Sequence, residues 1–235
     1  MRSVIIVLLF FISAKINAQD SSLIFIPAGQ SFSDVAKADK IYLLPNFTNG
    51  KVYFRDGSMN SANFNYNFLN GEMEFISSKG DTLAIVKEQA LNIKNIEIDS
   101  IRFYYYNGYL QELASNETGK ILRRQFYKLK KREKIGGYEQ PNATSAIESY
   151  STFVSGNGEQ PQTLTVRENV TLVKATEFFF GDRYNTFLRA NKKNALKLYP
   201  KKKAQIESFL LKNKVNFNNG KDLQKLLAYL QSAKK

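Results

Sequence analysis

The sequence predicts a mainly antiparallel β protein that ends in two short helices. Two-residue turn signals separate short alternating runs in the first half of the chain, and strand-like alternation returns between Thr163 and Phe180. A helical period of apolar residues follows Asp182. We therefore expect a β region over residues 19–132, arranged as a meander, a sandwich-like sheet or an open barrel. A segment of returning strands and helices, residues 163–235, is expected to pack on it.

Residues 1–18 have the pattern of a cleavable export signal. Arg2 gives the positive start, and the apolar run Val4–Ile12 is too short to cross ~30 Å of hydrocarbon as a permanent helix. Ala18 is the small residue that precedes a cleavage site, so we expect cleavage between Ala18 and Gln19. This predicts a protein outside the cytoplasm, in the periplasm, with the cell surface or secretion as alternatives. An uncleaved amino-terminal anchor is the other interpretation.

Hairpins are expected in the β region because turn dipeptides recur there. A type I′ turn at Asn70-Gly71 predicts a register that pairs Phe68 with Met73, Tyr66 with Phe75 and Phe64 with Ser77. A turn at Asn107-Gly108 pairs Tyr106 with Tyr109 and Tyr105 with Leu110. The five predicted turns are Asn49-Gly50, Asp56-Gly57, Asn70-Gly71, Lys79-Gly80 and Asn107-Gly108.

The later segments follow from changes in this pattern. The alternation of residues 91–98 changes face at Lys94-Asn95, which predicts a β-bulge. Residues 133–162 lose all periodicity, as expected of a polar loop or linker. Pro200 is placed in the first turn of one helix, and Asn219 is expected to cap the last. That last helix carries a stripe expected to pack on the sheet, formed by Leu223, Leu226, Leu227 and Leu230.

Two stretches of the sequence resemble a family of uncharacterised exported proteins from Bacteroidota. The first comprises 50–57, 65–67 and 71–73; the second contains the basic segment 197–203 before the two helices. The resemblance implies a cell-envelope context without an assigned activity. Asp81-Thr82-Leu83 and Asp99-Ser100-Ile101 also resemble the short O-glycosylation motif of that phylum.

Composition excludes several kinds of chemistry. The chain has no Cys and no His, so thiolate nucleophiles, disulfides and His-based triads or metal sites cannot form. No phosphate-binding or dinucleotide-binding motif occurs. We therefore expect a protein that is not an enzyme and needs no cofactor or metal. Hydrophobic residues make up 43% of the chain, which is enough for a core.

Basic residues cluster in two runs, and the formal net charge is +13. Outside the cytoplasm such runs favour anionic lipid, lipopolysaccharide or acidic glycan over nucleic acid as partners. The alternative is a solvated face that keeps the protein soluble. The first run is Arg123, Arg124, Lys128, Lys130, Lys131, Arg132 and Lys134; the second is Lys192, Lys193, Lys197, Lys201, Lys202 and Lys203.

Two strand faces support an alternative function in carbohydrate binding or cleavage. Glu72 and Glu74 share a face, as paired glycosidase carboxylates do, although solvent-exposed strand charges also protect sheets from aggregation. Tyrosines and asparagines on strands can stack on and hydrogen-bond sugars, although they also serve as ordinary strand residues. The residues concerned are Tyr104, Tyr106, Tyr109, Asn63, Asn65 and Asn67. The leading hypothesis is an exported, non-enzymatic envelope protein that binds or scaffolds an anionic component.

Overall fold

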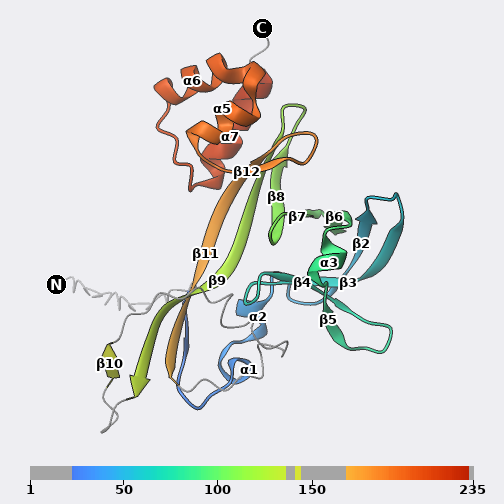
Figure 1. Ribbon diagram of the computed structural model, residues 1–235, viewed down its shortest axis with the longest axis vertical. Helices are drawn as coiled ribbons and strands as arrows, with labels where there is room; N and C mark the ends of the chain where they lie inside the picture. The colour runs from blue at the N-terminus through green and yellow to red at the C-terminus, as the bar shows by residue number, and fades with distance from the viewer. Residues whose placement is uncertain (1–22, 136–140, 144–167, 233–235) are drawn as a thin grey trace, which may run out of the picture.

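The computed structural model describes residues 23–135, 141–143 and 168–232, and their strands form one open antiparallel sheet (Figure 1). The order across the sheet is β1-β11-β9-β8-β7-β6-β2-β3-β4-β5, with β10 beside β9 and β12 beside β11. The strands are β1 (Leu23–Ile26), β2 (Thr48–Phe54), β3 (Met59–Asn67), β4 (Glu72–Ile76), β5 (Thr82–Ala84), β6 (Ile93–Ile98), β7 (Ile101–Tyr105), β8 (Tyr109–Ser115), β9 (Lys120–Ile135), β10 (Pro141–Ala143), β11 (Asn169–Gly181) and β12 (Phe187–Arg189).

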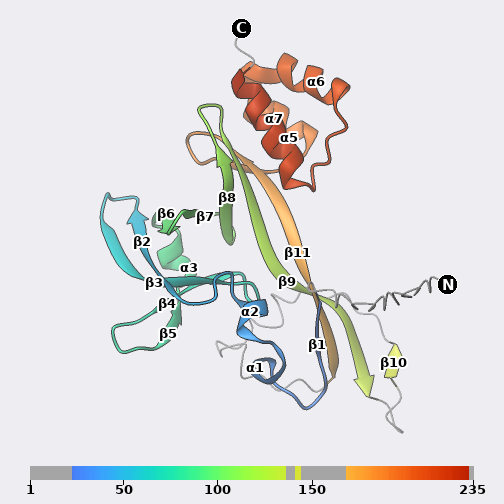
Figure 2. The same ribbon diagram turned by 180° about the vertical axis from the view of Figure 1, so that it is seen from behind.

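The helices are short, and most of the helical residues lie at the carboxyl end. They are α1 (Phe32–Val35), α2 (Ala38–Ile41), α3 (Lys87–Ala90), α5 (Lys192–Leu198), the 3-10 turn η2 (Pro200–Lys202), α6 (Lys203–Lys212) and α7 (Gly220–Ser232). We call residues 192–232 the helical cap. Figures 1 and 2 show it at one end of the long strands β9 and β11, with β1, α1 and α2 toward the other end. The predicted class, mainly antiparallel β with helices at the carboxyl end, is confirmed.

The largest core lies where the strands β2 to β7 and the lower part of β9 and β11 enclose Tyr66, Met73, Ile96 and Phe103. The sheet does not close, because β5 and β1 are its two ends. The loop after β3 nevertheless reaches β9, where the Tyr127 amide donates to the Phe68 carbonyl at 2.8 Å. This contact joins two parts of the sheet that are distant in strand order, and it encloses the core from that side.

The helical cap packs on one face of the sheet, at its own end of β9 and β11. The stripe of α7, Leu223, Leu226, Leu227 and Leu230, is buried against sheet residues that include Ile121 and Phe180. The predicted packing of this stripe on the sheet is therefore confirmed. Neighbouring residues on the strands alternate faces, and Leu122 and Phe179 accordingly belong to a separate small cluster with Phe187.

Four predicted turns are confirmed in position, although Asn70 lacks the positive φ of the predicted type I′ turn, whereas Asn49-Gly50 is not a turn. Gly57, Gly71, Gly80 and Gly108 have positive φ values of 92°, 71°, 90° and 110°. Gly50 instead lies within β2, between β3 and β6. A Cβ atom there would lie 2.6 Å from the Glu97 carbonyl oxygen, so the glycine permits a close approach of two strands rather than a turn.

Two predicted registers are wrong. In the β3–β4 hairpin Tyr66 pairs with Met73, two residues from the predicted partner, because residues 68–71 form a longer loop. Asn67 stabilises that loop by accepting from the Leu69 amide at 2.8 Å. A shift of two leaves every side chain on its predicted face. In the β7–β8 hairpin Tyr105 pairs with Tyr109, one residue from the prediction, since the loop has three residues.

The remaining predictions on the later elements have mixed outcomes. The bulge is confirmed: Tyr53 pairs with Asn95 and Phe54 with Ile93, which leaves Lys94 as the extra residue. The structure adds α5, whose only buried residue is Ala195, to the two helices expected. Its single buried position explains why no apolar stripe predicts it.

Some predictions fall on residues outside the described part. These are the export signal with its cleavage site, residues 136–140 and 144–162 of the expected loop, and strand residues 163–167. Residues 133–135 of that loop belong to β9, and 141–143 form β10. Among the described residues, no helix combines the length and apolar character needed to cross a membrane.

Candidate anion-binding site

The second basic run of the sequence surrounds a hollow on the helical cap. Its lining consists of Lys192, Lys193, Leu196 and Lys197 from α5 and Lys203 at the start of α6, around a volume of about 680 Å³. We call this the lysine hollow. All four lysines are exposed, so their ammonium groups reach solvent. Four cations thus surround one shallow hollow.

Local interactions fix the elements that carry these lysines. Asn191 begins α5 by accepting from the Asn194 amide at 2.8 Å. Tyr199 follows α5, and its hydroxyl donates to the Gly181 carbonyl of β11 at 3.0 Å. Pro200 then starts η2, which leads directly into α6. The buried Tyr199 ring anchors the α5–α6 junction to the sheet, and Lys197 and Lys203 lie on either side of that junction.

Three of the four lysines of the hollow are placed where the helix dipole disfavours them, whereas Lys197 lies in the last turn of α5, where the dipole favours a cation. Lys192 and Lys193 occupy the first turn of α5, and Lys203 occupies that of α6, where the helix dipole favours acidic residues. Lys193 and Lys197 are also like charges four positions apart on one helix. The stability of the helices therefore does not account for this arrangement of lysines. A bound anion would reduce the electrostatic repulsion between them.

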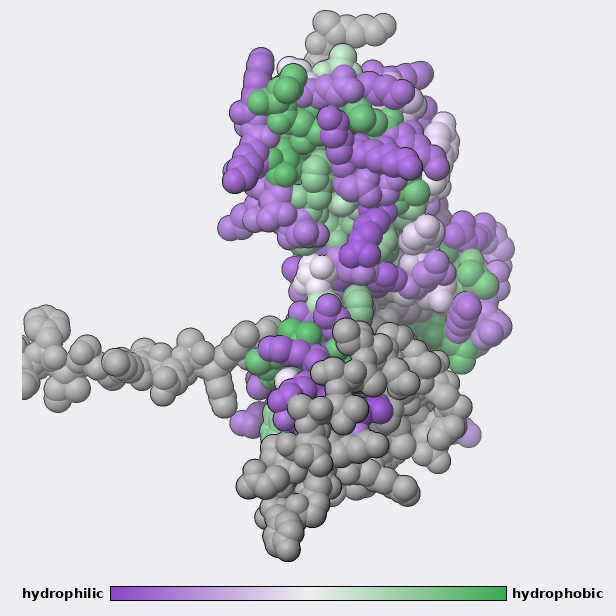
Figure 3. Space-filling view, turned by 60° about the vertical axis from the view of Figure 1, so that its left-hand side comes forward, coloured by the Kyte–Doolittle hydropathy of each residue, from purple (hydrophilic) through white to green (hydrophobic). Residues whose placement is uncertain are grey.

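Counter-charges are scarce on the cap. Within residues 190–232 the sequence has ten lysines and two carboxylates, Glu207 and Asp222. Asp222 is already engaged by the Asn216 amide at 3.0 Å. None of the hollow's four lysines forms an ion pair within the described ranges 23–135, 141–143 and 168–232. On the face seen in Figure 3, hydrophilic side chains cover most of the cap around a smaller apolar area.

The first basic run is not brought together in the same way, because adjacent residues of β9 lie on opposite faces. Arg124 donates to Glu177 and to the Asn107 carbonyl, and its guanidinium lies 5.3 Å from the Phe179 ring centroid. Arg123 is half-buried on the other face, where it donates to Gln111 at 2.8 Å.

Further along β9 the basic residues are divided between solvent and ion pairs. Lys128 and Lys130 are exposed. Lys131 pairs with Glu133 at 2.5 Å, and Arg132 pairs with Glu168 at 3.4 Å. The Lys134 side chain lies outside the described residues. Of the second run, Lys201 is exposed and Lys202 is half-buried beside the hollow. The basic residues of the first run thus share no common surface on which the predicted anion could bind. Those of the second run do share one.

The predicted carboxylate pair also has a structural explanation. Glu74 is 5% exposed and accepts from the Tyr42 hydroxyl at 2.8 Å and the Asn67 amide at 2.9 Å. It therefore joins the segment after α2 to the β3–β4 hairpin. Glu72 is exposed, and partial desolvation together with the charge of Glu74 raises its pKa. Neither carboxylate lines the lysine hollow or the groove of about 990 Å³ that is bounded by Val52, Phe64 and Ile93.

The tyrosine platform predicted for sugars is wrong, because its members are not exposed together. Tyr104 and Tyr109 are buried in two different clusters, whereas Tyr106 is 39% exposed. The asparagines do not form a polar face for a ligand either. Asn65 is 1% exposed and bonds to the backbone of Leu44, with its amide nitrogen 2.9 Å from the carbonyl oxygen.

Two half-buried lysines were not singled out by the sequence pattern. Lys174 Nζ lies 3.7 Å from the Phe68 ring centroid, and burial together with the charge of Arg123 lowers its pKa. Lys120 Nζ lies 5.4 Å from the Tyr104 ring centroid, and burial lowers its pKa as well. Lys174 meets a ring of the loop after β3 and Lys120 meets a ring of β7, so both contacts depend on how distant segments pack and are invisible in the linear sequence.

Comparisons and the search for metal ligands assign no further role. Within the described residues, no group of three or more acidic side chains is arranged to hold a metal ion. No protein-family model, no curated protein and no solved structure matches this chain. The lysine hollow is therefore interpreted from its own geometry.

Proposed function

We propose that the protein is exported to the cell envelope, with the periplasm as its location, and binds an anionic envelope surface through the lysine hollow of its helical cap. In this proposal it acts as a binding or scaffolding protein and not as an enzyme. The resemblance to exported Bacteroidota proteins supports the same context. The observation that carries the proposal is the convergence of four exposed lysines, unpaired within the described part of the chain, on one concave surface.

The magnitude of the electrostatic contribution is sufficient for peripheral binding. A basic residue close to an anionic membrane contributes about 1 kcal/mol, so four lysines contribute on the order of 4 kcal/mol before losses of side-chain entropy. Such binding weakens with salt because the Debye length falls to about 10 Å at 0.1 M ionic strength. The expected partner is therefore a phosphate-bearing lipid surface or another dense array of anions.

A vesicle-binding experiment tests the proposal. The purified exported protein is mixed with vesicles of phosphatidylglycerol and phosphatidylethanolamine, or of phosphatidylcholine alone, and the bound fraction is measured by sedimentation. We expect binding to the anionic vesicles only. Replacing Lys192, Lys193, Lys197 and Lys203 by Gln should weaken it at least tenfold.

A matched variant separates this site from net charge. Lys37, Lys51, Lys79 and Lys94 are also exposed and lie outside the cap. Changing these four to Gln removes the same total charge and should alter binding less than threefold. Equal losses in the two variants, or equal binding to neutral vesicles, would contradict a specific role for the lysine hollow.

A further inference from the structure

The strand β3 is paired on both sides over only part of its length. Its second half, residues 64–67, pairs with β2 or β4, whereas residues 59–63 have a register with β2 alone. Figures 1 and 2 show the β2–β3 hairpin and the β4–β5 hairpin diverging from each other in this region. All of residues 59–63 are exposed except half-buried Ala62. We call residues 59–63 the open edge.

The hairpin geometry shows which backbone groups of the open edge point outward. The Phe54 amide donates to the Ser58 carbonyl at 2.9 Å, and along an antiparallel ladder hydrogen-bonded pairs alternate with pairs that are not bonded. In this register the N–H and C=O groups of Met59 and Ser61 point away from β2. No segment within residues 23–135, 141–143 and 168–232 bonds to these outward groups. They are therefore able to pair with one more strand.

The open edge also lacks the features that prevent pairing with another chain. Exposed edge strands are commonly protected by lysine, by proline, by inward-pointing charges or by a β-bulge. The sequence of the open edge, Met-Asn-Ser-Ala-Asn, contains no charge and no proline. Its register with β2 is regular throughout. The open edge is therefore available for strand addition.

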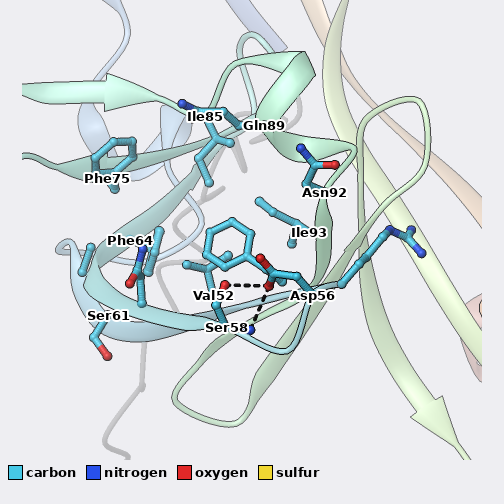
Figure 4. Close-up of a pocket in the computed structure, with 14 residues that line it drawn as sticks. Val52, Asp56, Ser58, Ser61, Phe64, Phe75, Ile85, Gln89, Asn92 and Ile93 are labelled. Atoms are coloured by element: carbon cyan, nitrogen blue, oxygen red, sulfur yellow. Dashed lines mark hydrogen bonds between the residues drawn. The ribbon is translucent and has the colours of Figure 1, made fainter.

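A groove of about 990 Å³ lies beside the open edge, between the β2–β3 hairpin and the segment around α3 (Figure 4). Val52, Phe64 and Ile93 are buried core residues that line it, and half-buried Phe75 and Ile85 extend the lining. We call it the apolar groove. A strand added to the open edge would therefore have an apolar concave surface under one of its faces.

Exposed apolar side chains concentrate around this groove. In the described part of the chain eight large hydrophobic side chains are exposed, and four of them flank the groove. Three are chain neighbours of lining residues, and the fourth pairs with Phe75 across β4 and β5. Apolar surface gathered in this way is typical of an interaction surface. The four are Met59 (47% exposed), Leu83 (44%), Val86 (52%) and Leu91 (58%).

Two charged residues also line the groove, in the turn between β2 and β3. Asp56 accepts from the Ser58 amide at 2.8 Å and the Ser58 hydroxyl at 2.7 Å, as the dashed lines in Figure 4 show. Arg55 donates through Nε to the Leu91 carbonyl at 3.1 Å. Their charges are opposite and both side chains are exposed, so they do not select an ionic ligand of one sign. An ion held by them would leave the apolar lining and the open edge unused.

A second copy of this chain fits the groove less well than a different peptide. Asn60 and Ala62 share the face of β3 that carries Phe64, so they face the groove. If two copies paired their open edges in the antiparallel direction about Ser61, each would bring its own Asn60 and Ala62 side chains to the groove of the other. One side chain is polar and the other is small, so neither fills an apolar lining. Larger apolar side chains at alternate positions of a different peptide would fill it.

We propose that the open edge binds an extended peptide of another protein as an additional antiparallel strand, with alternate apolar side chains in the apolar groove. This direction continues that of β3 with β2 and β4. Peptide residues opposite Asn60 and Ala62 face the groove, and the residue opposite Ser61 exchanges N–H···O=C bonds with it. A lipid chain would cover the outward N–H and C=O groups without bonding them, which is costly. The peptide bonds these groups and fills the groove together.

Two methylated peptides test whether the backbone of the open edge holds the ligand. The probe is a fluorescein-labelled nonapeptide of alternating threonine and valine with blocked ends, and its anisotropy is followed as it binds the purified protein. With the valines in the groove, only the threonine N–H groups point toward β3. N-methylation of the threonines should therefore weaken binding at least tenfold, whereas N-methylation of the valines should change it less than threefold.

Two results of this assay would overturn the proposal. Equal effects of the two methylations would mean that apolar or ionic contacts, and not hydrogen bonds to the open edge, hold the peptide. The absence of saturable binding of the unmethylated probe would mean that the open edge does not accept a strand.

Variants of Ser61 locate the binding site. Ser61→Pro removes an outward N–H and leaves the ladder to β2 intact, because that N–H is not bonded to β2. It should weaken probe binding at least tenfold. Ser61→Ala keeps the N–H and is the matched control, which should bind as the unmodified protein does. Equal affinity in the two variants would contradict the proposed site. If Ser61→Pro fails to fold, the methylated peptides still decide, because they are tested on the unmodified protein.

Light scattering distinguishes a foreign peptide from a second copy of the chain. We expect the unmodified protein and Ser61→Pro to have the same molecular mass in solution. A dimer of the unmodified protein that Ser61→Pro converts to a monomer would assign the open edge to a second copy and would overturn the proposal.

Discussion

At the scale of single residues, Glu74 illustrates how burial decides between structure and chemistry. The carboxylate is nearly inaccessible, and its oxygens accept from Tyr42 and from Asn67. A buried carboxylate with these partners stabilises the hairpin that carries it. Its removal deprives the Tyr42 hydroxyl and the Asn67 amide of this acceptor. Glu72, two positions earlier on the same strand face, is exposed and lacks this role.

Glu74→Ala should lower the free energy of unfolding by about 2 to 4 kcal/mol, because the Tyr42 hydroxyl and Asn67 amide lose their acceptor. Glu72→Ala should change it by no more than about 0.5 kcal/mol, since the raised pKa of Glu72 indicates that its charge is not favoured. Equilibrium denaturation in urea, followed by circular dichroism, measures both. Equal costs for the two substitutions would show that Glu74 does not have this structural role.

At the scale of elements, the sequence predicts turns and bulges better than it predicts which residues pair between strands. The turn at Asn70-Gly71 and the bulge at Lys94 depend on neighbouring residues and could be predicted. The β3–β4 register could not, because it depends on the Phe68 carbonyl reaching the Tyr127 amide of β9, which is distant in sequence. An Asn-Gly dipeptide can form a hairpin turn, or, as at Asn49-Gly50, its glycine can lie within a strand and permit the close approach of a neighbouring strand.

The candidate sites also divide into those that local spacing predicts and those that depend on the packing of distant segments. Helical spacing brings Lys193 and Lys197 together, so the second basic run could be predicted as a surface cluster. Alternation along β9 separates Arg123 from Arg124, so the first run forms no common surface. The groove bounded by Val52, Phe64 and Ile93 was not predicted, because its lining comes from strands and a helix that are distant in sequence, and only their packing forms a concave surface.

Tyr199 connects cap stability to the lysine hollow. Tyr199→Phe removes the hydroxyl that donates to Gly181 and should cost about 1 to 2 kcal/mol of stability. It should also weaken binding to anionic vesicles, because the α5–α6 junction is less firmly anchored to the sheet. Tyr229→Phe, on half-buried Tyr229 of α7, serves as the control. A stable Tyr199→Phe variant with unchanged vesicle binding would show that the hydroxyl does not position the hollow.

At the scale of the whole molecule, buried tyrosines make stability sensitive to alkaline pH. Burial raises the pKa of each of five buried tyrosines above the ordinary value near 10: Tyr66, Tyr104, Tyr109, Tyr127 and Tyr199. In the unfolded chain they lose their protons near pH 10, whereas the folded protein retains them. Their contribution to stability is therefore complete below about pH 10 and is lost as the pH rises above it.

An alkaline titration checks this directly. Ultraviolet absorbance should show exposed tyrosines ionising first and the five buried tyrosines only as circular dichroism reports unfolding. Stability measured in urea should fall with each step above about pH 10. Ionisation of all tyrosines in one step, with the fold intact, would be inconsistent with the burial of these five.

The charge distribution of the whole molecule supports the central claim that the cap is an electrostatic contact surface. The measurement that tests it most directly is the salt dependence of binding to anionic vesicles, compared between the unmodified protein and the variant with the four hollow lysines changed to Gln. We predict that affinity falls steeply with salt for the unmodified protein and only weakly for the variant. The same steep dependence in both proteins would contradict the claim.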